Sequence, residues 1–116
     1  DGKKVMKEKV ERILDEIGID YRYHHFETTE AVPPPFITWT TPEDANFFAD
    51  GVVYVADSNI DIELYTDAKD FELEQRIETI LNQHKIPWKK SEQYIEDEDL
   101  YEVLYETNGG SFDGRE

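Results

Sequence analysis

Apolar residues recur along this chain at two different spacings, and the change between them constrains the fold more than any other feature. Over residues 3–17 they lie three and four positions apart, which predicts an amphipathic helix that ends at Gly18. Over residues 59–66 apolar and polar residues alternate, which predicts a strand with one face on the core. The two faces of this strand are Ile60, Ile62 and Leu64 on one side, and Asp61, Glu63 and Tyr65 on the other.

A second amphipathic helix is predicted over residues 68–84. Asp67 is its expected N-cap, and Glu72 and Glu74 suit the positive end of the helix dipole. Pro87 prevents the helix from continuing. The expected apolar stripe consists of Phe71, Leu73, Ile77, Ile80 and Leu81.

Strands are also expected before this second helix. Residues 21–26 and the β-branched and aromatic run 36–41 favour extended backbone, and Pro33 to Pro35 between them forbid a helix. Asp50-Gly51, between the apolar runs 47–49 and 52–55, is a strong hairpin signal.

After the second helix, two last strands are expected at residues 88–95 and 100–107, joined by the acidic turn 96–99. Residues 108–116 are polar and Gly-rich, so a mobile tail is expected there. The sequence therefore predicts one α+β domain over residues 1–107, in which two helices pack on a mainly antiparallel sheet in two layers.

The charge of the chain is its most informative bulk property. The 116 residues include 28 acidic and 12 basic side chains, for a formal charge of −16. Residues 1–17 contain five of each sign, so the rest of the chain carries the whole acidic excess. Such a surface repels phosphate, which argues against binding nucleic acids or anionic membranes. A simple role in solubility, a basic partner, mimicry of DNA, and a channel wall for passing DNA all remain open.

The composition also limits the environment in which we expect this protein. The chain has no cysteine, which excludes disulfides and thiolate chemistry and fits a reducing, cytosolic compartment. No apolar run approaches the roughly 20 residues that a membrane-spanning helix needs.

No catalytic, metal or cofactor site is expected. His24 and His25 are adjacent in an extended segment and point to opposite faces, so they are poorly placed to chelate one ion together. The run Glu96, Asp97, Glu98 and Asp99 has oxygen ligands but lacks the spacing of an EF-hand loop, which favours a solvated turn. A carboxylate pair for acid–base catalysis needs apolar shielding to raise one pKa, and the sequence gives no sign of such shielding.

Two groups of residues are candidates for assembly surfaces. Lys3, Lys4 and Lys7 lie in the first turns of the first helix, where the dipole prefers acids. Either this end of the helix frays, or the lysines face an acidic surface such as one on a neighbouring subunit. The aromatic residues Trp39, Phe47 and Phe48 either form a surface for a neighbouring subunit or fill the core.

The order of these elements resembles that of the tail completion proteins of long-tailed bacteriophages, also called tail terminator or tail-to-head joining proteins. The likeness covers residues 3–107. It consists of the first helix, the segment Pro33–Trp39, the hairpin at Asp50-Gly51, the strand Ile60–Thr66, the helix Phe71–His84, and the closing segments Tyr94-Ile95 and Leu100–Val103.

The resemblance implies a structural protein of the virion tail, assembled in the host cytoplasm. Such proteins form a ring, typically a hexamer, that caps the tail tube and joins the tail to the head. Their partners are further copies of themselves and other tail or connector proteins. Asp61, Glu63 and Glu96 to Asp99 are then candidates for an acidic lumen or partner face. The alternatives are an acidic inhibitor that mimics DNA and caps a basic enzyme, and a small enzyme with an unrecognised acidic site.

Overall fold

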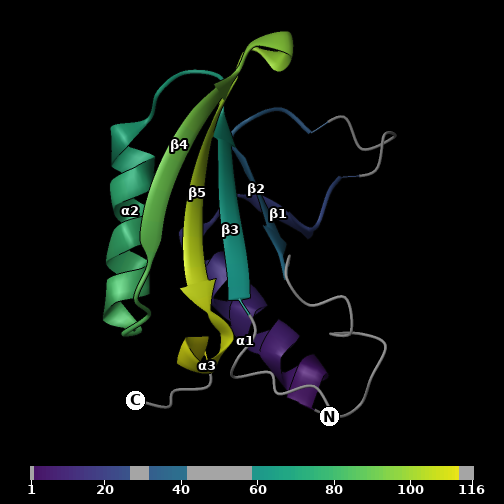
Figure 1. The fold of residues 1–116 in the computed structure, drawn as a ribbon, viewed down its shortest axis with the longest axis vertical. Helices are drawn as coiled ribbons and strands as arrows, with labels where there is room; N and C mark the ends of the chain where they lie inside the picture. Colours follow the sequence, from purple (N-terminus) through teal and green to yellow (C-terminus); the bar gives the residue numbers. More distant parts are fainter. Residues whose placement is uncertain (1, 27–31, 42–58, 113–116) are drawn as a thin grey trace.

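The computed structural model describes residues 2–26, 32–41 and 59–112, which form a five-stranded sheet with helices packed against it (Figure 1). The elements in chain order are α1 (Gly2–Ile17), β1 (Asp20–Tyr23), β2 (Phe36–Thr40), β3 (Asn59–Thr66), α2 (Phe71–Gln83), β4 (Lys89–Ile95), the 3₁₀ turn η2 (Glu96–Glu98), β5 (Leu100–Asn108) and α3 (Gly109–Phe112). This is the α+β class that the sequence predicts. The expected hairpin at Asp50-Gly51 lies outside the described residues.

The strands are ordered β1-β2-β3-β5-β4, and β1–β2 is the one parallel pair among the described strands. The closing hairpin therefore returns beside β3 through β5, and β4 lies at one edge of the sheet. In the centre, Ile62 of β3 stands opposite Trp39 of β2 and Tyr105 of β5. Side chains alternate between the two faces, so this register decides which residues share a face.

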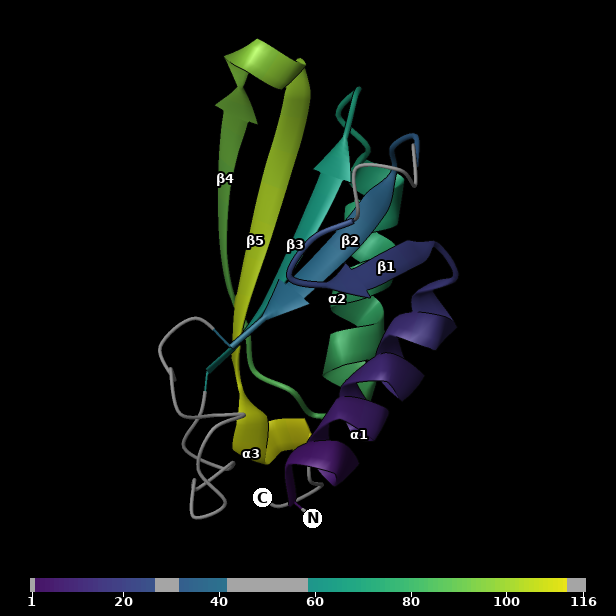
Figure 2. The ribbon, with the colours of Figure 1, turned by 90° about the vertical axis from the view of Figure 1, so that its right-hand side faces the viewer.

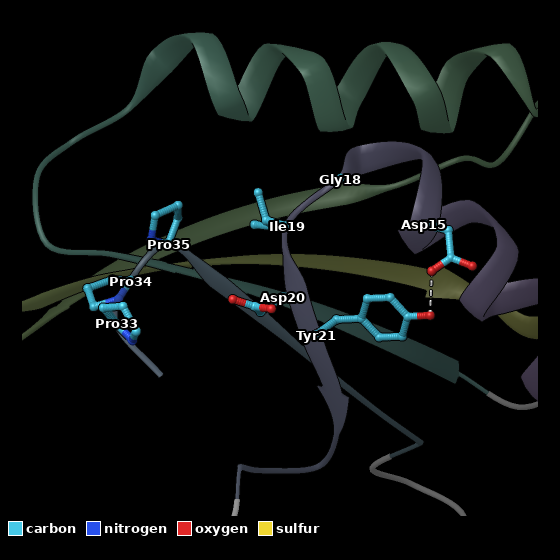
Figure 3. Close-up of a pocket in the computed structure, with 8 residues that line it drawn as sticks. All are labelled: Asp15, Gly18, Ile19, Asp20, Tyr21, Pro33, Pro34 and Pro35. Atoms are coloured by element: carbon cyan, nitrogen blue, oxygen red, sulfur yellow. Dashed lines mark hydrogen bonds between the residues drawn. The ribbon is translucent and has the colours of Figure 1, made fainter. Parts of the chain in front are cut away.

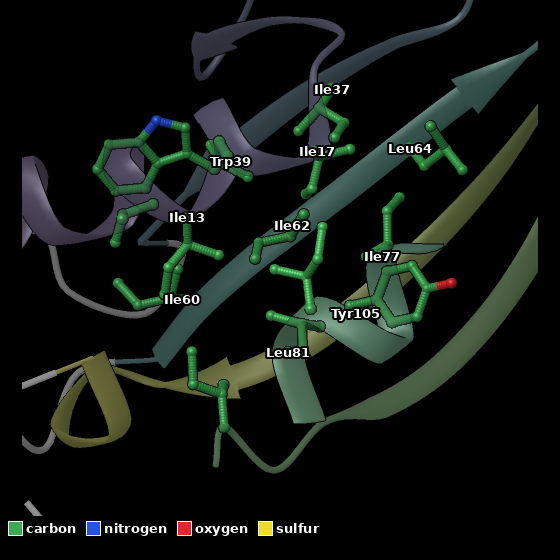
Figure 4. Packing of buried hydrophobic residues seen from close by; sticks show 14 of the residues in the cluster. Ile13, Ile17, Ile37, Trp39, Ile60, Ile62, Leu64, Ile77, Leu81 and Tyr105 are labelled. Carbon is green, nitrogen blue, oxygen red and sulfur yellow. The ribbon is translucent and has the colours of Figure 1, made fainter. Parts of the chain in front are cut away.

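Both α1 and α2 cover the same face of the sheet (Figure 2). The predicted alternation in β3 is confirmed, because Ile60, Ile62 and Leu64 are fully buried beneath the helices. They pack with apolar residues of both helices and of β2 and β5 (Figure 4). Burying each of these side chains contributes roughly 1.5–3 kcal/mol, which makes this interlayer core the main source of stability.

The structure confirms the predicted end of α1 and corrects the predicted start of α2. Gly18 has φ of 87°, and its N–H lies 3.4 Å from the Leu14 carbonyl oxygen, which confirms it as the end of α1. Asp67 is the wrong N-cap for α2: the Asp70 carboxylate accepts the hydrogen bond from the Leu73 N–H at 3.0 Å. Because the helix begins only at Phe71, that side chain points outward and is 72% exposed, so it is not part of the apolar stripe.

The folded chain continues past residue 107, where a mobile tail was expected. Gly109–Phe112 form α3, and Phe112 is buried in the core. The Asn108 side chain accepts a hydrogen bond from the Gly110 N–H at 2.9 Å and so fixes the turn into α3. Strand β1 is shorter than expected because the backbone leaves the extended region at His24, whose φ is 70°.

An ion-pair network on the covered side ties α2 to β4. Glu74 is almost completely buried, and its carboxylate contacts Lys69 Nζ at 2.6 Å and Lys90 Nζ at 2.9 Å. Lys90 also pairs with Glu78 at 2.6 Å, and the Tyr105 hydroxyl donates to Glu78 at 2.8 Å. A buried carboxylate is tolerated only when it is paired in this way, so the network holds the hairpin in place against α2.

Candidate functional site

The face of the sheet opposite α1 and α2 is the candidate functional surface, and we call it the open face. The strand registers give its central residues as Phe36, Thr38, Thr40, Asp61, Glu63, Tyr65, Leu100, Glu102, Leu104 and Glu106. Four of the ten are carboxylates, and Asp61 of β3 stands directly opposite Glu106 of β5. Like charges in opposed positions destabilise a sheet, and Lys89 of β4, which stands opposite Glu106 on its other side, offsets part of this cost.

Glu63 and Glu102 come together around Tyr65 at the centre of the open face. The Tyr65 hydroxyl lies 2.9 Å from Glu102 Oε2 and 3.2 Å from Glu63 Oε2, within donating distance of both carboxylates. The Thr38 hydroxyl donates to Glu63 at 3.4 Å, and the Gln93 amide donates to Glu102. Four strands therefore contribute to one hydrogen-bonded acidic cluster.

The two carboxyl groups of this cluster have pKa values shifted in opposite directions. Burial, together with the hydrogen bond and the negative charge of Glu102, raises the pKa of Glu63 to about 7. Burial alone would raise the pKa of Glu102 as well, but hydrogen bonds from Glu63, Gln93 and Tyr65 lower it. Burial and both carboxylates also raise the pKa of the Tyr65 phenol. Near neutral pH the pair therefore shares one proton, which Glu63 donates to Glu102.

An aromatic hollow of about 310 Å³ adjoins this cluster. The ring of Phe36 stacks on Tyr65 at 5.1 Å between centroids and meets Phe26 edge-on at 5.1 Å. The Arg22 guanidinium lies 5.0 Å from the centroid of the Phe26 ring. The hollow is lined by His24, His25, Phe26, Val32, Phe36, Thr38, Tyr65, Ile95 and Glu98. It joins apolar and acidic surface on the open face.

The predicted acidic turn forms at the tip of the β4–β5 hairpin, and its four acids are exposed as expected. Asp99 takes a left-handed conformation with φ of 53°, and its carboxylate accepts a hydrogen bond from the Tyr94 hydroxyl at 2.9 Å. Glu98 lines the aromatic hollow, so the turn and the open face meet there. Asp61 lies towards the opposite end of β3, next to Glu106.

A larger hollow of about 550 Å³ lies between the end of α1, β1 and the three prolines (Figure 3). The Tyr21 hydroxyl donates to Asp15 at 2.7 Å within it. Burial, together with the hydrogen bond and charge of Asp15, raises the pKa of Tyr21 to about 12, so this phenol stays protonated at physiological pH. The described residues that line this hollow include no activated nucleophile and no cluster of metal ligands, and we assign it no chemistry.

The residues that were predicted to form assembly surfaces have different surroundings in the structure. Trp39 is fully buried in the core, 4.7 Å from the ring centroid of Tyr23, so its assignment to an assembly surface is wrong. It stands on the covered face because it alternates with Thr38 and Thr40. Phe47 and Phe48 lie outside the described residues. Lys3 and Lys4 belong to the first turn of α1, and the side chain of Lys7 is 52% exposed and pairs with Glu11 at 3.9 Å.

The sequence alone does not predict Glu102 and Tyr65 as partners of Glu63, or Gln93 as a donor to Glu102. Asp61 and Glu63 were expected on a solvent face without shielding for a carboxylate pair, whereas Glu63 is half-buried and has a raised pKa. The alternation within each strand already places Tyr65 beside Glu63, and Glu102 beside Leu104. The missing information was the pairing of β3 with β5, which no local pattern encodes.

Among the described residues of the open face, the carboxyl cluster is the arrangement that could take part in proton transfer. A carboxyl group that titrates near neutral pH can exchange a proton. Here, however, the group lies on the surface of the sheet beside an open hollow, and not in the enclosed pocket that is typical of a catalytic site. Within the described part of the chain, no group of three or more His, Cys, Asp or Glu side chains is arranged to hold a metal ion. Among those residues, no helix has the length and apolarity to span a bilayer.

Comparisons with known proteins gave no match to any family model, to any curated protein or to any solved structure.

Proposed function

We propose that this chain is a non-catalytic structural protein of a long-tailed bacteriophage or prophage. In this proposal six copies form a ring at the head-proximal end of the tail tube, where the ring stops tube growth and joins the tail to the head. The resemblance of the sequence to tail completion proteins suggests this role, and the open face is the observation that carries it. The protein would belong to the virion tail and be assembled in the host cytoplasm.

The open face has the properties of a surface that meets another macromolecule. It combines half-buried carboxylates with the apolar side chains of Phe36, Leu100 and Leu104. Its hollows are open, and its central acid pair is held by hydrogen bonds from three neighbouring side chains. A sheet that retains opposed acids at a cost to its own stability fits selection for a partner better than selection for folding.

The overall charge supports the same role. At −16 per chain, a ring of six subunits would present a strongly negative wall to DNA. Phosphate would be repelled from that wall, so that DNA could pass without adhering. The exposed acids at the tip of the β4–β5 hairpin, Glu96 to Asp99, add to that field.

The molar mass in solution, measured by light scattering, tests this proposal. We expect a closed ring, either of the protein alone at high concentration or after purified tail-tube protein is added. A chain that stays monomeric and ignores tube protein under all these conditions would contradict the ring. In that case salt-sensitive binding to a basic DNA-handling enzyme would identify an acidic inhibitor instead.

A further inference from the structure

We propose that the open face of one subunit binds the first turns of α1 of the next subunit, so that the ring is held by a head-to-tail contact between a basic helix end and an acidic sheet. This inference rests on the proposed ring and specifies its interface. Two separate observations lead to it, one on each surface.

The first observation is the charge of the α1 end. Residues 2–7 contain three lysines and no acid, and the first turn of α1 has no acidic residue. Positive side chains at a helix N-terminus are disfavoured by the dipole, typically by 0.3–1 kcal/mol each. Lys7 is exposed, and its ion pair is with Glu11 on its own helix, an i,i+4 contact worth only about 0.3–0.5 kcal/mol. An acidic surface from outside the chain would offset this unfavourable arrangement.

The second observation is the excess of acid on the open face. No Lys or Arg of the described residues forms an ion pair with Glu63 or Glu102, whereas Glu74 on the covered side has two lysines. Asp61 and Glu106 lie on the same face. Lys89 of β4 stands opposite Glu106 and Arg22 of β1 stands beside Thr38, so four central acids share the face with two basic side chains. The apolar side chain of Leu104 lies among them, where the alkyl stem of an incoming lysine can pack while its ammonium group reaches the carboxylates.

The two surfaces cannot meet within one subunit. α1 lies on the covered side of the sheet, and its first turns are at one end of the molecule (Figure 2). The acidic face looks the other way. Complementary patches on different sides of a subunit make a heterologous contact, which repeats from copy to copy and closes a ring where the rotation between copies permits. Charge complementarity and the positions of the patches therefore both select a second copy as the occupant.

Charge reversal on each surface tests the contact. The helix variant is Lys3→Glu, Lys4→Glu and Lys7→Glu together, and it should fold well because acids suit the start of α1. The face variant is Asp61→Lys with Glu106→Lys, which replaces the opposed acids by opposed bases and adds a like charge opposite Lys89 of β4. Each variant alone should weaken self-association at least about tenfold in sedimentation velocity, since each places like charges across the interface.

Mixing the two variants gives the decisive result. The acidic helix of the first fits the basic face of the second, and the basic helix of the second fits the acidic face of the first. An equimolar mixture should therefore assemble in alternation although neither variant does so alone, and one chain with all five changes should also assemble. Arg12→Glu on α1 and Glu72→Lys on α2 are exposed controls away from both surfaces and should assemble like the wild type.

The outcomes separate this inference from the proposed ring. If the wild type and both reversal variants form equal rings, the ring stands and this interface is wrong. If the reversals abolish assembly but the mixture does not restore it, the proposed pairing of the α1 end with the open face of the next subunit is wrong. If the wild type forms no ring alone or on tail-tube protein, the proposed function itself fails. Circular dichroism of each variant checks that the monomer is folded.

Discussion

Two carboxylates on opposite sides of the sheet, Glu74 of α2 and Glu63 of β3, have opposite surroundings, and their comparison separates structure from function. Glu74, on the covered side, is 2% exposed and contacts two lysine ammonium groups. Glu63, on the open face, is half-buried and has another carboxyl group, Glu102, as its neighbour. The first charge is neutralised by two lysines of the same chain, while among the described residues no lysine or arginine pairs with the second.

This difference shows what each side of the sheet is for. Burial alone would lower the pKa of Lys69 and Lys90, but hydrogen bonds to Glu74 and to their second carboxylates raise both values. The covered side thus completes its own charge balance and stabilises the monomer. On the open face, no Lys or Arg of the described residues forms an ion pair with Glu63 or Glu102, which fits a surface that is completed by a partner.

The largest effect should come from Trp39, which marks the covered face. Trp39→Ala should lower the free energy of unfolding by about 3–5 kcal/mol, because it empties a fully buried site. Phe36→Ala, on the open face of the same strand, should cost only about 1–2 kcal/mol, since Phe36 is half-buried. Urea denaturation measures both values. Equal losses would mean that the two faces are buried alike and would remove the basis of the comparison.

A smaller effect is expected when the covered ion-pair network is opened. Lys90→Met leaves Glu78 without its lysine and Glu74 with only Lys69, so the protein should lose about 2 kcal/mol of stability. The neighbouring Lys89 faces the other side of β4, and Lys89→Met should change stability by less than about 0.5 kcal/mol. Thermal unfolding of the two variants, followed side by side, makes the measurement. A loss for Lys89→Met as large as for Lys90→Met would show that the network is not specific.

Much of this fold follows from the sequence because its signals are local. The helical stripe of α1, its end at Gly18 and the alternation of β3 each depend on residues close in the chain. The start of α2 was misplaced because Asp67 and Asp70 are equally good N-caps, and only tertiary packing selects the second.

The candidate site was beyond local signals. Glu63 and Glu102 are 39 positions apart in the chain and meet because β5 pairs with β3 rather than lying beyond β4. The position of Trp39 was also beyond local signals, because its large ring suits a core and an interface equally well. Phe112 was assigned to a tail by the composition around it, although a single aromatic residue is enough to anchor a short helix to the core.

The smallest effect concerns the cost of the open acid pair. The pKa of Glu63 is higher in the folded protein than its ordinary value, so the folded state holds a proton that the unfolded chain releases. The stability that Glu63 contributes through this proton is therefore fully present below about pH 4.5 and is lost as the pH rises through about 7. Glu63→Gln removes this loss and should make the protein more stable at pH 8 by about 1 kcal/mol, after solvent screening is allowed for. Glu106→Gln, on the same face but exposed, is the matched control for urea denaturation at pH 5 and pH 8.

The titration of Glu63 itself tests the central contrast between the two faces most directly. Its side-chain carboxyl carbon can be followed by ¹³C NMR in the folded monomer between pH 3 and pH 9. We predict a midpoint near pH 7, because Glu63 shares a proton with Glu102 and no Lys or Arg in the described part of the chain pairs with it. A midpoint near 4.5, the ordinary value for a glutamate, would show that the open face is electrostatically balanced and would contradict the account given above.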